Sequence, residues 1–139
     1  MARDVRTLSP RARLAWGLFC IALGCYPIAM AFGFIDVDPA ELTSPPWVIA
    51  GAGLAFVIAG LMILLAMHSR LNDLLAGVLC LLFGIMGTWV SLLSSDDGFS
   101  GGLFFLSPDA NILLGRIFFG IGALISFGVA FYALQRASR

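Results

Sequence analysis

Four long apolar runs, separated by short polar segments, make up most of the chain. They cover residues 13–34, 47–68, 71–93 and 112–134, and each is near the length of about 20 residues that lets an α-helix cross about 30 Å of hydrocarbon. The link between the second and third runs, around Ser69 and Arg70, is short, so those helices must be antiparallel neighbours. The pattern predicts an all-α, up-down-up-down four-helix bundle that spans a membrane.

Composition supports the same fold class. Hydrophobic residues form 60% of the 139 residues, charged residues only 12%, and the mean hydropathy is +1.01. These values exclude an ordinary soluble domain. The segments outside the runs, among them loops 35–46 and 94–111, are too short to bury a core of their own. We therefore expect one transmembrane domain over residues 1–139, with the lipid bilayer as its main surroundings.

The charges are distributed unevenly, although the formal net charge is zero. Basic residues flank the first run, the link between the second and third runs, and the end of the fourth run: Arg3, Arg6, Arg11, Arg13, Arg70, Arg136 and Arg139. Loops 35–46 and 94–111 hold acidic residues and no basic one: Asp36, Asp38, Glu41, Asp96, Asp97 and Asp109. Positively charged loops stay in the cytoplasm, so both termini are expected inside, with the acidic loops outside. All basic residues are arginine, which suggests a GC-rich bacterial genome. We expect the chain to lie in the inner membrane.

Small residues recur at the same spacing in the first and third runs: Gly17, Cys20 and Gly24, then Gly77, Cys80 and Gly84. Steps of three and four residues place them on one helix face, as in a helix-packing seam where backbones approach closely. Two interpretations remain open, a duplicated two-helix hairpin or a coincidence among residues that are common in membrane helices. The second and fourth runs have stripes of their own: Gly51, Ala55 and Ala59, then Gly122, Ser126 and Ala130.

Arg116 is a charge inside the fourth run, about one turn from its outer end. Ionisable residues within a membrane are costly, so this arginine is a candidate contact for an anionic substrate or a lipid headgroup. Alternatively, its long side chain extends outward to Asp109, Asp96 or Asp97 and fastens the loop to the helices. Both interpretations make Arg116 and Asp109 candidate site residues.

The loop 94–111 contains an apolar stretch that includes Phe104 and Phe105. Exposed phenylalanines in a loop need cover, which lipid headgroups, a re-entrant fold onto the helices or a partner protein could supply. These two residues join Arg116 and Asp109 as candidate interaction or lipid contacts.

Residues that could support catalysis are few. No acidic residue lies deep in a run, where a proton-coupled exporter needs one, and there is no phosphate-binding loop, Ser/His/Asp set or basic nucleic-acid surface. His68, the single histidine, and the three cysteines have no metal-ligand spacing. We therefore expect no enzyme activity, no metal, no cofactor and no nucleic-acid partner.

Three short motifs carry a resemblance: Pro46-Trp47-Val48, Thr88-Trp89 and Gly115-Arg116-Ile117-x-Phe119-Gly120. With these, the chain resembles small four-span bacterial inner-membrane proteins of uncharacterised activity, which implies the architecture and no reaction. In size and number of spans it is also similar to the small membrane subunits of tripartite solute transporters.

These features predict a non-catalytic accessory or scaffold subunit of a bacterial inner-membrane complex, which associates with a larger membrane protein or with itself. The alternative is a homo-oligomeric channel or small-solute transporter, in which Arg116 and the acidic loops shape a mouth. A lipid-handling enzyme is the third and weakest hypothesis, because only Arg116 and the loop carboxylates could supply its chemistry.

Overall fold

The computed structural model describes residues 9–37, 44–65, 69–96 and 107–138, and these fold into four α-helices. They are α1 (Pro10–Ala31), α2 (Pro46–Leu64), α3 (Ser69–Leu92) and α4 (Pro108–Ala137). All four are long and apolar enough to cross a membrane, which confirms the all-α prediction and its four runs. The longest, α4, has 30 residues and so extends for about 45 Å at 1.5 Å per residue.

Helices α1 and α4 start three and four residues before their apolar runs because a Ser-Pro pair begins each of them. The Ser9 hydroxyl accepts a hydrogen bond from the Ala12 N–H at 3.2 Å, and Ser107 accepts one from the Ala110 N–H at 3.3 Å. In both helices proline follows the cap, where its missing N–H costs nothing. Helices α1 and α4 therefore begin at residues 10 and 108, not at the predicted 13 and 112.

Gly33 ends α1 before the apolar run does. Its φ of +74° lies in the left-handed region that glycine adopts without strain. The Phe34 N–H donates to the Ala29 carbonyl at 2.9 Å and the Gly33 N–H to the Met30 carbonyl at 3.1 Å, the bonding of a Schellman motif. The helix stops at Ala31, although the hydrophobic pattern continues to Phe34.

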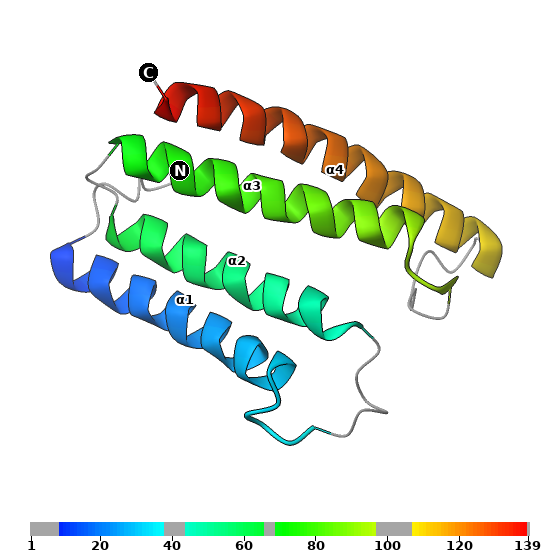
Figure 1. Cartoon of the computed structure of the whole chain (residues 1–139), viewed down its shortest axis with the longest axis horizontal. Helices are drawn as coiled ribbons and strands as arrows, with labels where there is room; N and C mark the ends of the chain where they lie inside the picture. Colours follow the sequence, from blue (N-terminus) through cyan, green and yellow to red (C-terminus); the bar gives the residue numbers. More distant parts are fainter. Residues whose placement is uncertain (1–8, 38–43, 66–68, 97–106, 139) are drawn as a thin grey trace.

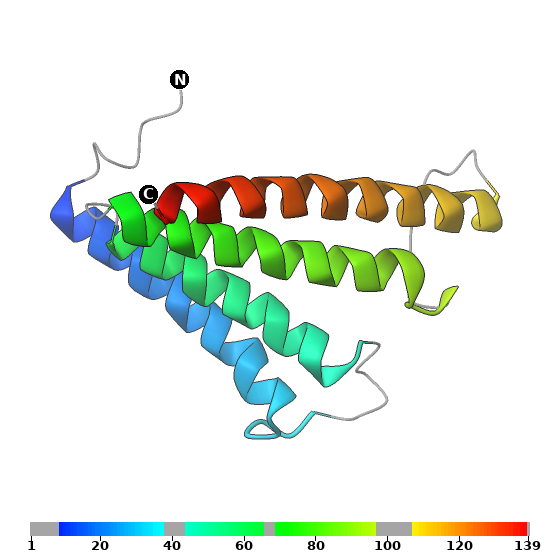
Figure 2. The same cartoon turned by 45° about the horizontal axis from the view of Figure 1, so that its top comes forward.

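The four helices alternate in direction, as predicted, and lie side by side in the order α1, α2, α3, α4 (Figure 1). Contacts are extensive within the hairpins α1/α2 and α3/α4 and much sparser between α2 and α3, while the remaining pairs barely meet. Figure 2 shows the two hairpins diverging from the end where α1 starts and α4 finishes. The bundle is therefore an open layer with α1 and α4 as its edges.

Glycines face each other across the first hairpin. A Cβ added to Gly53 would lie 2.5 Å from the Gly24 carbonyl oxygen, and one added to Gly60 would lie 2.7 Å from that of Gly17. Both pairs are two helical turns apart, and all four glycines are buried. Backbone therefore packs on backbone between α1 and α2, as small residues permit in membrane helices.

The second hairpin has the same kind of seam. A Cβ on Gly77 would meet Leu134 at 2.8 Å and the Ala130 carbonyl at 3.4 Å, and a Cβ on Gly84 would meet the Phe127 ring at 2.7 Å. The glycines at 17, 24, 77 and 84 thus lie in packing seams, as the sequence predicted. Cys20 and Cys80, at corresponding positions between them, are half-buried free thiols.

Contacts in the two hairpins correspond residue by residue when 60 is added to positions in α1 and 70 to positions in α2. Gly17 packs on Gly60 and Leu64 in the first hairpin, as Gly77 packs on Ala130 and Leu134 in the second. Gly24 packs on Val57, as Gly84 packs on Phe127. This equivalence supports the interpretation of the chain as a repeated two-helix hairpin.

The stripe predicted for α4 is confirmed at Ala130 but not at Gly122. Gly122 is exposed, and a Cβ added there would meet no atom of the described residues within 4 Å. The seam on α4 contains Ala123 and Ala130, which are buried. The prediction was wrong at Gly122 because α4 carries small residues on more than one face, and spacing alone does not distinguish those faces.

Candidate functional site

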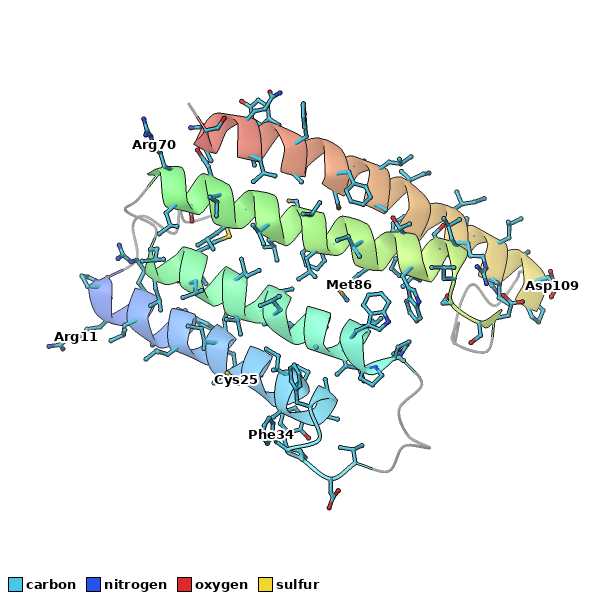
Figure 3. The ribbon with its side chains drawn as sticks, viewed as in Figure 1. Arg11, Cys25, Phe34, Arg70, Met86 and Asp109 are labelled. Carbon is cyan, nitrogen blue, oxygen red and sulfur yellow. The ribbon has the colours of Figure 1, made fainter. Side chains whose placement is uncertain are left out.

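The two ends of the layer carry opposite charges. Figure 3 shows Arg11 and Arg70 at the end where α1 starts, and Phe34 and Asp109 at the other. We call these the basic end and the acidic end. The helix order places Arg136, near the end of α4, at the basic end as well.

At the acidic end, Arg116 of α4 binds the final turn of α3 and the residues after it. Its Nη1 donates to the Ser91 carbonyl at 2.9 Å, and its Nη2 donates to the Ser94 carbonyl at 2.7 Å and to Asp96 Oδ1 at 2.8 Å. The Ser91 hydroxyl donates in return to the Arg116 carbonyl at 2.8 Å. We call these four residues the Arg116 clamp.

The clamp neutralises a helix end. The last carbonyls of a helix lack intrahelical donors and carry partial negative charge, so a guanidinium there is favourable. The side chain of Arg116 is 25% exposed and that of Asp96 is 69% exposed. Because an exposed ion pair contributes little, the hydrogen bonds to the two carbonyls supply most of the stabilisation.

The hydrogen bonds of Arg116 fit the interpretation in which this arginine fastens the start of the loop, with Asp96 among its partners. Asp109 lies instead in the first turn of α4 and is exposed, where its charge suits the helix N-terminus. Phe104 and Phe105 belong to residues 97–106, outside the described residues.

Arginine also links helices at the basic end, a feature that the sequence did not reveal. Arg13 Nη2 lies 3.5 Å from the carbonyl of Leu64, the last residue of α2. Arg136 of α4 forms an ion pair with Asp73 of α3 at 3.1 Å. Each hairpin is thus fastened by an arginine where one of its helices ends. The position of Arg13 near the start of α1, like that of Arg116 near the start of α4, was an available sequence signal.

The two hairpins meet through a small apolar contact between α2 and α3, which we call the junction. The rings of Trp47 and Trp89 are 5.4 Å apart and nearly perpendicular. Met86 lies between the two helices (Figure 3), where a Cβ added to Gly51 would be 3.1 Å from its sulfur and 3.6 Å from Leu82. The two tryptophans thus join the hairpins through an edge-to-face contact.

The polar contacts described above join neighbouring helices. Among the described residues there is no buried polar or charged residue and no group of three His, Cys, Asp or Glu residues that could hold a metal ion. The polar side chains instead bind helix ends and each other. The arrangement can position helices and present apolar surface.

Comparison of this chain with protein-family models, with curated proteins and with solved structures found no match. The chain is therefore described by its own features. The described residues form four helices that are long and apolar enough to cross a membrane, and the seams pair these helices into two hairpins.

Proposed function

We propose that the chain is a non-catalytic accessory or scaffold subunit of a bacterial inner-membrane complex. The open layer carries this proposal. In a closed four-helix bundle every helix packs against two neighbours, whereas here α1 and α4 each have one extensively packed neighbour. Large side chains such as Phe118 and Leu124 on α4 are exposed, and in a bilayer they are available to lipid or to a partner's helices.

The charge distribution supports an orientation for this subunit. The start of α1, the start of α3 and the end of α4 share the basic end, and Asp109 lies at the opposite end. By the positive-inside rule the basic end faces the cytoplasm, with both termini. A reporter that matures only in the cytoplasm, fused after the last residue, should be active; activity of a periplasm-specific reporter there would contradict this orientation.

The clamp favours an accessory role over a channel with Arg116 at its mouth. Both terminal nitrogens of the guanidinium already bind carbonyls or Asp96. An anion would have to compete with these hydrogen bonds, and its binding would release the end of α3. Arg116 therefore serves the fold first.

Extraction from native membranes in a mild detergent, followed by size-exclusion chromatography and mass spectrometry, tests the proposal. A larger membrane protein should travel with the tagged chain in fixed stoichiometry. A tagged unrelated four-span protein from the same membranes serves as the control for nonspecific recovery. Recovery of the chain alone, as a monomer or as a pure self-assembly, would overturn the accessory role.

A further inference from the structure

The correspondence of positions between the two hairpins also includes the residues of the junction. Positions in α1 and α3 correspond with a difference of 60, and positions in α2 and α4 with a difference of 70, as the seam contacts establish. In the junction, Trp47 and Gly51 of α2 face Trp89 and Met86 of α3. Each of these faces therefore has a counterpart on an edge helix.

On α4 the counterparts of Trp47 and Gly51 are Ile117 and Ile121, and Ile125 continues the same row one turn later. All three isoleucines are exposed, Ile121 at 54%. Neither the seam of α4 nor the Arg116 clamp includes this row. The isoleucines thus form an exposed apolar ridge on α4, whereas the corresponding face of α2 is covered by α3.

On α1 the counterparts of Met86 and Trp89 are Tyr26 and Ala29, and that of Leu82 is Ala22. Tyr26 is 59% exposed and Ala22 is exposed as well. At the junction Gly51 on α2 is small and its neighbour Leu82 on α3 is large. At the edges these two sizes are exchanged, with Ile121 on α4 and Ala22 on α1. Ala29 leaves room for Ile117 where the junction has two tryptophans, whereas Tyr26 remains large in the place of Met86.

We propose that a second copy of this chain docks its α1 edge onto the α4 edge and repeats the junction between molecules. In this contact Ile121 lies opposite Tyr26, and Ile117 lies opposite Ala29. Helices α1 and α4 are antiparallel, as α2 and α3 are, so both copies keep the same orientation in the bilayer. Because the contact joins two different surfaces of the chain, its repetition builds a closed ring or an open row of copies. It requires only copies of this chain and is independent of the accessory role.

Disulfide cross-linking in native membranes tests this contact. In a background where Cys20, Cys25 and Cys80 are replaced by alanine, the variants Tyr26→Cys and Ile121→Cys carry different tags. Oxidation of membranes that contain both should give a cross-linked dimer with both tags, and membranes with either variant alone should give none. A chain with both substitutions should give a ladder of oligomers, which ends at the ring size if the assembly closes.

Gly122→Cys is the matched control for Ile121→Cys. It lies at nearly the same depth but is turned by about 100° around α4, and a Cβ there meets no described atom within 4 Å. Its cross-link to Tyr26→Cys should be several-fold weaker. Equal yields at both positions, no mixed dimer from variants that reach wild-type levels in the membrane, or cross-linking of Tyr26→Cys to itself would overturn the proposal. Cross-linking of both edges to a different, larger protein would overturn it too.

Discussion

Gly24 provides a direct test of the backbone contact between α1 and α2. In Gly24→Ala the new Cβ would lie 2.8 Å from Val57 Cγ2 and 2.9 Å from the Val57 backbone nitrogen, as well as against the Gly53 carbonyl. Two of these three atoms are backbone, so no rotamer change relieves the contact and the helices must separate. Overpacking of this kind costs about 1–3 kcal/mol of unfolding free energy.

A matched control isolates the packing contribution. Gly122→Ala makes the same chemical change on α4, where no described atom lies within 4 Å of the new Cβ. Both substitutions gain the same intrinsic helix propensity, about 1 kcal/mol, so this gain cancels in their difference. We expect Gly24→Ala to be less stable than Gly122→Ala by about 1–3 kcal/mol. Gly51→Ala should fall between them, because its nearest contact is the flexible Met86 side chain at 3.1 Å.

Unfolding in mixed micelles with an increasing fraction of denaturing detergent, followed by tryptophan fluorescence, measures these differences. The substitutions leave the fluorophores Trp16, Trp47 and Trp89 in place. The expected order of stability is Gly122→Ala, then Gly51→Ala, then Gly24→Ala. Equal stability of Gly24→Ala and Gly122→Ala would refute the close approach of α1 to α2.

Two further predictions concern the contacts between helices. Arg116→Ala should lower the free energy of unfolding by about 1.5–3 kcal/mol, and Asp96→Asn by less than about 1 kcal/mol because Asp96 is exposed. Thermal denaturation in detergent compares the two variants, and equal losses would show that the ion pair dominates the clamp. A double-mutant cycle of Trp47→Ala and Trp89→Ala should give a coupling of about 0.5–1.5 kcal/mol, and a coupling near zero would contradict the contact between the rings.

Hydrophobicity and spacing predicted the number of helices, their alternation and the seam positions on α1 and α3, because length and small-residue periodicity are local properties. Helix ends were less accurate because caps determine them. The Ser107-Pro108 start of α4 and the Gly33 end of α1 are both readable from sequence, but neither coincides with a change in hydrophobicity.

The partner of Arg116 could not be chosen from sequence. Asp96 and Asp97 precede the start of α4 and Asp109 lies in its first turn, and a long side chain that extends outward could reach any of them. The choice depends on where α3 ends relative to α4, which the seam sets through contacts such as Gly87 with Ala123. The register of α3 along α4 is therefore what the sequence left undetermined.

The open layer follows from which faces with small residues meet another helix, because Gly122 and Gly128 of α4 meet no atom of the described residues within 4 Å. In lipid an apolar residue does not indicate whether its face meets protein or lipid, because both surroundings are equally apolar. Close approach of backbones, which small residues permit, is what distinguishes the faces. Helix α2 has Gly53 and Gly60 toward α1 and Gly51 toward α3, so it takes two neighbours. Helices α1 and α4 each have one seam and take one neighbour within the chain. Four helices of this kind form a row with two edges, and closure requires a contact from outside the chain.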